Sequence, residues 1–275
     1  MRTLVHLSDL HFGRVDSALI EPLVSLVAQI KPDVVVVSGD LTQRARTTQF
    51  QEARRFLDLL PSPQIVVPGN HDVALYNVFS RFLRPLDKYR RYITNDLTPF
   101  HADEEIAVLG INTARSLTIK DGRINAVQVG QAQGKLADLD ANVVKVIVTH
   151  HPFDLPGEED EPVGRAPMAM AVFASFGIDL LLAGHLHVGR TGSTERYALD
   201  GHTALVVQAG TATSTRARGE PNSFNVIRID RPRIEIARFA WDPSRAIFAT
   251  FSEELFRKEG GVWSRIDRQD FRDDV

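Results

Sequence analysis

The sequence of 275 residues contains no cysteine. This absence excludes disulfides, catalysis by a thiolate, and zinc or iron–sulfur sites with cysteine ligands. A chain of this length can bury a large hydrophobic core without such crosslinks. We therefore expect any bound metal to act in catalysis rather than to stabilise the fold.

The sequence also lacks long apolar runs and a strong charge of one sign. No run approaches the roughly 18 residues that a membrane-spanning helix needs. No signal peptide is recognisable, because a strand-like pattern begins at residue 3 and Asp9 follows almost at once. The net charge is only −3, whereas nucleic acid binding favours a basic surface. These absences predict a cytoplasmic protein without a membrane span, and they disfavour a nucleic acid partner.

Strands and helices alternate in the first part of the chain. Short apolar strands are predicted at residues 3–7, 34–37 and 64–67, and amphipathic helices between them at residues 19–30 and 50–60. The second strand consists of four valines, which is typical of a strand buried on both faces. This order predicts a largely parallel sheet with right-handed crossovers.

The second half of the chain is rich in predicted strands. They span residues 106–111, 145–149, 178–183, 204–208, 224–229 and 233–239. We therefore predict an α/β fold in which two stacked, mixed β-sheets are flanked by helices, an αββα sandwich.

Two segments depart from this pattern. Residues 76–100 are aromatic and basic, and we predict one or two inserted helices there. These helices either pack with a solvated charged face or form a small cap that contacts substrate. Residues 252–275 mix charged and aromatic side chains and are expected to pack on the body or on a second subunit of a homodimer. The chain is thus predicted to be one domain over residues 1–251, followed by this tail.

Histidine and acidic side chains gather where the predicted strands end. Six of the nine histidines and four acidic or amide residues lie in these loops. They are Asp9, His11, Asp40, Asn70, His71, Asp72, His150, His151, His185 and His187. In an open α/β sheet the carboxyl ends of the strands form one crevice in which ligands bind. We therefore expect these side chains to meet at one site.

The spacing of these residues suits metal binding. One residue separates Asp9 from His11, and one separates His185 from His187. Alternate residues of an extended segment point to the same side, so each pair can reach one ion or two adjacent ions. Oxygen and imidazole ligands without thiolate suit manganese, iron, zinc or nickel rather than calcium. Seven such ligands exceed the need of one tetrahedral zinc and suit two ions that share a carboxylate.

Five short motifs carry a resemblance to a known family. They are Asp9-x-His11, Gly39-Asp40, Gly69-Asn70-His71-Asp72, His150-His151-Pro152 and Gly184-His185-x-His187. In content and order they resemble the five motifs of the calcineurin-like metallophosphoesterase superfamily. One motif alone would be unspecific, whereas five in the same order form a specific signal. The resemblance implies a phosphoesterase that binds two divalent or trivalent metal ions.

The resemblance also implies which residues hold the ions. Asp40 would bridge them. The first ion would be held by Asp9, His11 and His187, and the second by Asn70, His150 and His185. His150 is preferred over His151 as the ligand because the family's ligand in this motif stands two residues before a proline.

His71 and Asp72 are the predicted catalytic residues. By the same resemblance, His71 is not a ligand but approaches the phosphate and the leaving-group oxygen, and Asp72 orients it. A hydroxide held between the two ions would attack phosphorus in line, and the ions would neutralise charge in the transition state. A protonated His71 would then stabilise or protonate the leaving alkoxide.

Arginines close to the ligand motifs are candidates for substrate binding. Arg14 and Arg44 follow directly after the first and second motifs, and His151 lies beside a ligand. Each arginine also fits an ordinary surface position, and His151 also fits a supporting position behind the ligands. Further candidates near the predicted rim are Arg115, Arg216 and Arg218.

In overall layout the chain resembles bacterial family members that cleave phosphodiesters. The branch that hydrolyses 3′,5′-cyclic nucleotides and glycerophosphodiesters is the nearest, so the expected partner is a small phosphodiester substrate. The alternatives are a hydrolase of nucleotide-linked lipid precursors or phosphomonoesters, and a nuclease. An inactive protein-binding scaffold is the alternative of another class, but such a scaffold would be expected to lose ligands or His71.

Overall fold

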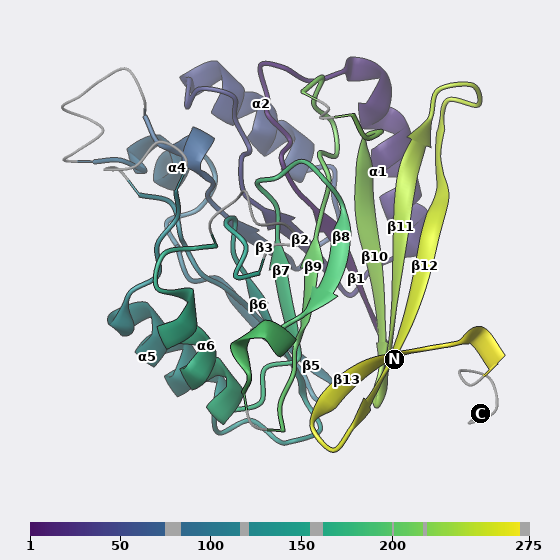
Figure 1. The fold of residues 1–275 in the computed structure, drawn as a ribbon. Coiled ribbons are helices and arrows are strands. Elements are labelled where there is room, and N and C mark those ends of the chain that lie inside the picture. The colour runs from purple at the N-terminus through teal and green to yellow at the C-terminus, as the bar shows by residue number, and fades with distance from the viewer. Residues whose placement is uncertain (75–83, 116–120, 155–161, 200, 217–218, 270–275) are drawn as a thin grey trace.

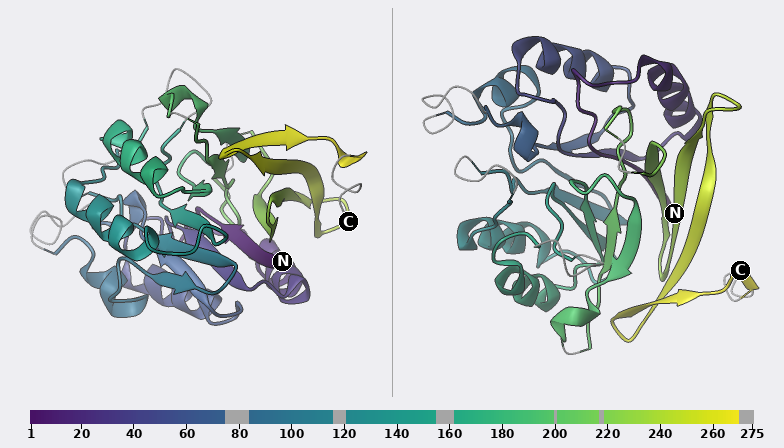
Figure 2. Two further views of the ribbon diagram at one scale, coloured as in Figure 1. Left: turned by 90° about the horizontal axis from the view of Figure 1, so that it is seen from below. Right: turned by 45° about the horizontal axis from the view of Figure 1, so that its top comes forward.

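Two β-sheets face each other, and helices cover both outer surfaces (Figure 1, Figure 2). This computed structural model describes residues 1–74, 84–115, 121–154, 162–199, 201–216 and 219–269. Both sheets contain parallel and antiparallel pairs. The arrangement confirms the predicted αββα sandwich of mixed sheets.

The first sheet has the strand order β13-β12-β11-β10-β1-β2-β3. Its strands are β1 (Arg2–Leu7), β2 (Val34–Ser38), β3 (Gln64–Val67), β10 (Ser223–Asp230), β11 (Arg233–Asp242), β12 (Ile247–Glu259) and β13 (Val262–Ile266). The strands β1, β2 and β3 are parallel, and β10 pairs antiparallel with β1. The three predicted N-terminal strands therefore form the parallel part of this sheet.

The second sheet has the strand order β4-β5-β6-β7-β9-β8. Its strands are β4 (Phe100–Ala102), β5 (Ile106–Gly110), β6 (Val144–Val148), β7 (Leu180–Ala183), β8 (Arg190–Ser193) and β9 (Leu205–Gln208). The four central strands β5, β6, β7 and β9 are parallel, while β4 and β8 pair antiparallel at the two edges.

Helices flank each sheet on its outer face (Figure 1). They are α1 (Ile20–Ile30), α2 (Thr47–Leu57), α4 (Asp87–Tyr92), α5 (Ala126–Leu136) and α6 (Ala166–Ser175), with short 3-10 helices at Ser17–Leu19, Asn70–Asp72 and Glu195–Tyr197. In Figure 1, α1 and α2 lie against the first sheet, and α5 and α6 against the second. In the described part of the chain, no helix combines the length and apolar character needed to span a membrane.

The valine strand shows why both faces of the first sheet are apolar. Val34 and Val36 pack with residues of the second sheet in the core between the sheets. Val35 and Val37 belong to a separate core that the sheet forms with α1 and α2. Successive side chains of a strand point to opposite faces, so a strand between two apolar layers must be apolar at every position.

Part of the predicted insertion is attached to the body of the fold. Residues 76–83 lie outside the described residues, so the predicted helices there are not described. The remainder contains α4, which packs beside α2. Tyr89 of α4 is fully buried, and its hydroxyl donates a hydrogen bond of 2.9 Å to the Val66 carbonyl.

The segment after residue 251 continues the first sheet. The predicted boundary at residue 251 falls within β12, which pairs with β11 along its length. The strand β13 then returns along β12, and Trp263 is buried in the core between the sheets. Residues 252–266 therefore lie on the same chain's body in this structure.

Candidate metal centre

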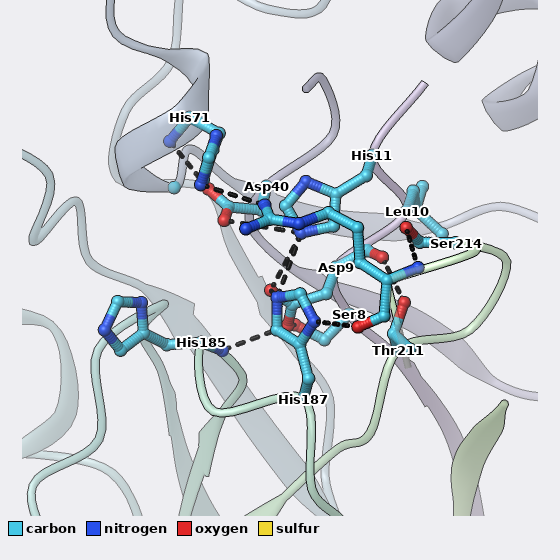
Figure 3. A network of polar contacts seen from close by, with 12 residues as sticks. Ser8, Asp9, Leu10, His11, Asp40, His71, His185, His187, Thr211 and Ser214 are labelled. Carbon is cyan, nitrogen blue, oxygen red and sulfur yellow. Dashed lines mark hydrogen bonds and ion pairs between the residues drawn. The ribbon is translucent and has the colours of Figure 1, made fainter. Parts of the chain in front are cut away.

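Five loops at the carboxyl ends of strands meet at one edge of the sandwich. Three follow β1, β2 and β3 of the first sheet, and two follow β6 and β7 of the second. Figure 3 shows side chains from both sheets converging there. The Nε2 atoms of His11 and His187 lie 3.1 Å apart although 176 residues separate them in the sequence. The fold therefore brings the rims of the two sheets together.

Four side chains form a first cluster at this edge. They are Asp9, His11, Asp40 and His187, all buried, with donor atoms within 4.8 Å of one another. Asp9 Oδ1 lies 3.2 Å from His187 Nε2 and 3.6 Å from His11 Nε2. Asp40 Oδ2 lies 3.8 Å from His11 Nε2.

A second cluster lies on the other side of Asp40. Asn70 Oδ1 is 3.0 Å from His150 Nε2 and 3.2 Å from His185 Nδ1. Asp40 Oδ1 is 3.4 Å from His150 Nε2. Asp40 thus directs a different carboxylate oxygen toward each cluster. The structure thus brings all seven predicted ligands together in two clusters on either side of Asp40.

The spacing of the donor atoms fits metal ligation. Two atoms that ligate one ion at about 2.0–2.1 Å lie roughly 2.9–3.4 Å apart for bond angles between about 90° and 109°. The separations of 3.1 Å between His11 and His187 and 3.0 Å between Asn70 and His150 fall in this range. Within the described residues, the buried Oδ1 of Asp9 has no hydrogen-bond partner. An ion would satisfy this oxygen, so the residues present fit the metals that the motifs imply.

Outer hydrogen bonds orient several of these ligands. Asp9 Oδ2 accepts from Ser8 Oγ at 2.6 Å and from the His185 backbone N–H at 3.0 Å, which leaves Oδ1 directed toward the cluster. His150 Nδ1 faces the Ser38 carbonyl at 2.8 Å, and its donation there directs Nε2 toward the second cluster. His187 Nδ1 faces the Arg216 carbonyl at 3.2 Å in the same way. Ligating histidines in metalloproteins are oriented by such bonds.

The loops that carry the ligands have an unusual backbone. Five candidate ligands have a positive φ, with values between 49° and 76°. They are Asp9, His11, Asp40, His185 and His187. Residues other than glycine rarely adopt this left-handed conformation, which costs of order 1–3 kcal/mol and concentrates at functional sites. The surrounding fold therefore holds these side chains in position at a local cost.

Two glycines allow the loops to approach each other closely. A Cβ atom at Gly69 would lie 2.1 Å from Asp40 Oδ1, and one at Gly184 would lie 1.8 Å from Ser8 Oγ. Any larger residue would displace the Asp40 carboxylate or the loop that orients Asp9. The glycines of the motifs are thus required for space rather than for backbone freedom alone.

The electrostatics of the centre favour a cation. Burial would raise the pKa of Asp9, but contacts with His11 and His187 outweigh it and hold that pKa well below its ordinary value. Burial likewise opposes ionisation of Asp40, whose pKa is nevertheless lowered by His150. Burial, with the charge of His150, lowers the pKa of His185 to about 4. At neutral pH the centre therefore holds two charged carboxylates and a neutral His185.

His71 lies beside the first cluster but outside it. Its ring stands edge-on to the His11 ring, with 5.0 Å between the centroids (Figure 3). Its Nδ1 lies 2.8 Å from the Gln43 carbonyl, to which it donates, and its Nε2 accepts from Arg216 Nη1 at 3.2 Å. Nε2 is thus unprotonated in this arrangement.

The structure places Asp72 differently from our expectation that it orients His71. Its carboxylate accepts hydrogen bonds from the backbone of Leu41, Thr42 and Gly69 and from the Thr42 hydroxyl. Burial and the charge of Asp40 raise its pKa to about 6. Asp72 therefore ties the loop after β3 to the loop after β2, while the Gln43 carbonyl orients the His71 ring.

The predicted substrate-binding residues fall into two places. His151 is buried beside His185, with 4.7 Å between the ring centroids, and its Nδ1 lies 2.8 Å from Thr113 Oγ1. It belongs to the group of histidines around the second cluster. Arg14 and Arg44 are instead exposed and line a pocket beside His71.

The other candidate arginines that the structure describes, Arg115 and Arg216, line different pockets. Arg216 lines the same pocket as Arg14 and Arg44, whereas Arg115 Nη2 donates to Gln128 Oε1 at 2.7 Å and lines a different pocket. Arg218 lies outside the described residues.

Several contributors to the centre carried no signal in the sequence. The carbonyls of Ser38, Gln43 and Arg216 act through backbone atoms, which any residue type supplies. Thr211, whose hydroxyl donates to the Asp9 carbonyl at 2.7 Å, is separated from it by 202 residues. Only the fold brings these atoms to the ligands.

Comparisons of the sequence with known proteins match it to phosphoesterases. A sequence profile described as calcineurin-like phosphoesterase matches residues 2–189. The glycerophosphodiester phosphodiesterase GpdQ of Enterobacter lignolyticus is 28% identical over 171 residues, which are 58% of this chain and 60% of the relative. A probable cyclic nucleotide phosphodiesterase of Vesicomyosocius okutanii is 24% identical over 42% of this chain and 57% of the relative. The chain thus covers about three fifths of the length of these relatives.

Solved structures show the same fold at low sequence identity. The purple acid phosphatase PPD1 of yellow lupin superposes with a TM-score of 0.71 and 12% identity, over 92% of this chain and 53% of that one. GAP50, the anchor in the inner membrane complex of Plasmodium, superposes with a TM-score of 0.61 and 11% identity, over 94% of this chain and 89% of that one.

Proposed function

The chain belongs to the calcineurin-like phosphoesterase family, and from this membership we propose that it hydrolyses phosphodiesters with two bound metal ions. The observation that carries the proposal is the position of Asp40, whose two oxygens lie 3.8 Å from His11 Nε2 and 3.4 Å from His150 Nε2. A carboxylate between two groups of ligands suits two adjacent ions. Imidazole and oxygen donors suit manganese, iron, zinc or nickel.

Each group of side chains has one task in this proposal. Asp9, His11 and His187 would hold one ion, and Asn70, His150 and His185 would hold the other, with Asp40 available to both. When bound, such ions neutralise phosphoryl charge and supply a nucleophile from water. The carboxylates stay ionised at neutral pH because the surrounding histidines lower the pKa values of Asp9 and Asp40.

His71 is proposed to act on the leaving group. Its Nδ1–H is committed to the Gln43 carbonyl, so a catalytic proton has to be carried at Nε2. Protonation at Nε2 would replace the hydrogen bond from Arg216 and free that guanidinium for a substrate oxygen. A protonated Nε2 then donates its proton to the departing alkoxide. General-acid catalysis requires the acid to come within hydrogen-bond reach of the leaving group.

The proposed substrates are small phosphodiesters, with 3′,5′-cyclic nucleotides as the first to test. The names of two relatives support this choice, since one is a glycerophosphodiester phosphodiesterase and another a probable cyclic nucleotide phosphodiesterase. All seven candidate ligands and His71 are present in this chain, which favours an enzyme over a protein-binding scaffold that would be expected to lose them. A cytoplasmic location and a homodimer stay predictions from the sequence.

Hydrolysis of model substrates tests the proposal. The protein loaded with Mn²⁺ should hydrolyse bis(p-nitrophenyl) phosphate faster than p-nitrophenyl phosphate, and chelation of the metal should abolish both activities. Inertness toward both esters with any of the four metals would refute an enzymatic role and favour a scaffold. A screen of cyclic AMP, glycerophosphodiesters and UDP-linked lipid precursors would then rank the natural substrate classes.

A further inference from the structure

A cationic pocket adjoins the candidate centre. Its volume is about 470 Å³, and four of its seven lining residues are arginines, while none is acidic. The arginines are Arg14, Arg44, Arg46 and Arg216. The chain as a whole has a net charge of −3, so this positive charge is a local feature. We call it the arginine pocket.

Loops that are distant in the sequence build the arginine pocket. Arg14 follows β1, Arg46 immediately precedes α2, and Arg216 follows β9. The Arg14 carbonyl accepts from the Thr215 backbone N–H at 2.8 Å, which joins the first of these loops to the last. In the described part of the chain, no carboxylate forms an ion pair with Arg14, Arg46 or Arg216. Their charges therefore remain available to an anion.

The backbone beneath the arginines is held in place. Gln49 is buried, and its Oε1 accepts from the backbone N–H of Arg44 at 3.0 Å and of Arg46 at 3.4 Å. Gly13 has a φ of 100°, and a Cβ atom there would lie 2.1 Å from Gln49 Nε2. The loops thus close around Gln49, while the guanidinium groups of Arg14, Arg44 and Arg46 extend from exposed positions.

His71 forms the boundary between the arginine pocket and the metal centre. Arg216, which lines the pocket, donates to His71 Nε2 at 3.2 Å. Gln43, which also lines the pocket, accepts from His71 Nδ1 through its carbonyl. On its other side the His71 ring contacts the His11 ring. An ester arm that leaves the metal centre past His71 therefore enters the arginine pocket.

We propose that the arginine pocket binds a second anionic group, a phosphate monoester carried by one arm of the phosphodiester substrate. This inference rests on the proposed function and narrows its substrate class. Guanidinium groups bind phosphate through paired N–H donors, and a phosphate in turn relieves the repulsion among neighbouring arginines. The substrate class is then a phosphodiester with a phosphorylated alcohol, in preference to a cyclic nucleotide with a single charge.

Calorimetric titration of the Mn²⁺-loaded protein with two matched ligands tests the inference. Thymidine 5′-monophosphate offers one phosphate, which the metal centre can take, and thymidine 3′,5′-bisphosphate adds a second. We expect the bisphosphate to bind about tenfold more tightly, as charge-assisted hydrogen bonds to one phosphate would provide. Equal affinities for the two ligands would overturn the proposal.

Two variants locate the second phosphate. The double variant Arg14→Gln/Arg46→Gln should reduce the preference for the bisphosphate to about twofold or less, through loss of the charge-assisted bonds. Arg55→Gln is the matched control, because Arg55 is an exposed arginine of α2 that does not line the pocket. It should keep the wild-type preference. A preference that survives the double variant would contradict the inference.

Salt dependence tests the inference without a variant. The preference of the wild-type protein should fall several-fold between about 0.05 and 0.5 M salt, because exposed charges are screened. A preference that is insensitive to salt would place the second phosphate elsewhere.

Hydrolysis of bis(p-nitrophenyl) phosphate by the same preparation separates the proposed function from the inference about the arginine pocket. Activity without a bisphosphate preference refutes only this inference, and a preference without any hydrolysis refutes only the proposed function.

Discussion

The metal centre and the arginine pocket lie on opposite sides of His71 and are built in opposite ways. In the first cluster of the centre every side chain is buried and stands on a backbone position with a positive φ, where the surrounding fold holds it. In the arginine pocket the backbone is fixed by Gln49, while Arg14, Arg44 and Arg46 are exposed on long side chains. Contacts of His71 with Arg216 and Gln43 join the two regions, and the Arg216 carbonyl also faces His187 Nδ1 of the centre.

This difference matches what each region is proposed to recognise. Ligation of a metal needs donor atoms within a few tenths of an ångström of their ideal distances, and buried, constrained side chains provide this. Attraction between a guanidinium and a phosphate weakens gradually with distance, so flexible side chains suffice. Changes in the centre should therefore act almost all-or-none, and changes in the arginine pocket should have graded effects.

The largest effect is expected from Asp40→Ala. Loss of the shared carboxylate should lower metal content in both clusters and reduce turnover by roughly 10³-fold or more, because the ions supply several kcal/mol of transition-state stabilisation. Elemental analysis and hydrolysis of bis(p-nitrophenyl) phosphate measure the two effects. The exposed Asp58 of the α2 C-terminus provides a matched control, Asp58→Ala. Normal metal occupancy in Asp40→Ala would contradict the bridging role.

His71→Ala tests the boundary between the two regions. Turnover of a diester with an alkyl leaving group should fall by roughly 10²–10⁴-fold, the usual worth of a general acid, with little change in metal content. The loss should be much smaller for a p-nitrophenyl leaving group, which departs without protonation. His101→Ala, a histidine of β4 outside the centre, is the control. Equal losses for both leaving groups would show that His71 is not the acid.

The pH dependence should also distinguish the regions. Burial alone would lower the pKa of His150, but the charge of Asp40 raises it to about 9 in the metal-free protein. Metal binding must displace this proton, so metal affinity should rise by up to about tenfold per pH unit between about pH 7 and 9 and then level off.

Titration of the metal-free protein with Mn²⁺ in buffers of different ionisation enthalpy measures the released proton. The preference for the bisphosphate should stay constant over the same range, because guanidinium groups remain charged there. Metal affinity that does not change with pH would contradict a protonated His150.

The smallest effect is expected on stability from Arg46→Gln. The side chain is exposed, and surface substitutions of this kind change the free energy of unfolding by less than about 0.5 kcal/mol. Urea denaturation measures this change. A loss above about 2 kcal/mol would mean that Arg46 supports the fold and is not simply a side chain of the pocket.

Sequence patterns predicted the parallel strands and the helices between them because burial produces local periodicity. The strand predicted at residues 34–37 and the helix predicted at residues 19–30 correspond to β2 and α1. Other elements carried weaker patterns. In α6 nearly every residue is apolar, so no polar stripe marks it as a helix. In β12 five of the thirteen residues are charged and the apolar positions do not alternate regularly, which hid its place in the sheet.

The sequence alone determined the residue types and the order of the ligand motifs, because metal ligation demands particular side chains at the ends of particular strands. Only the tertiary structure decided how these residues are shared and oriented. In the tertiary structure the two oxygens of Asp40 face different clusters, and the Gln43 carbonyl orients the His71 ring. The fold also brings Arg14 and Arg216 to one pocket. Such contacts join residues that are far apart in the chain and depend on backbone atoms and strand pairing, which local sequence patterns do not record.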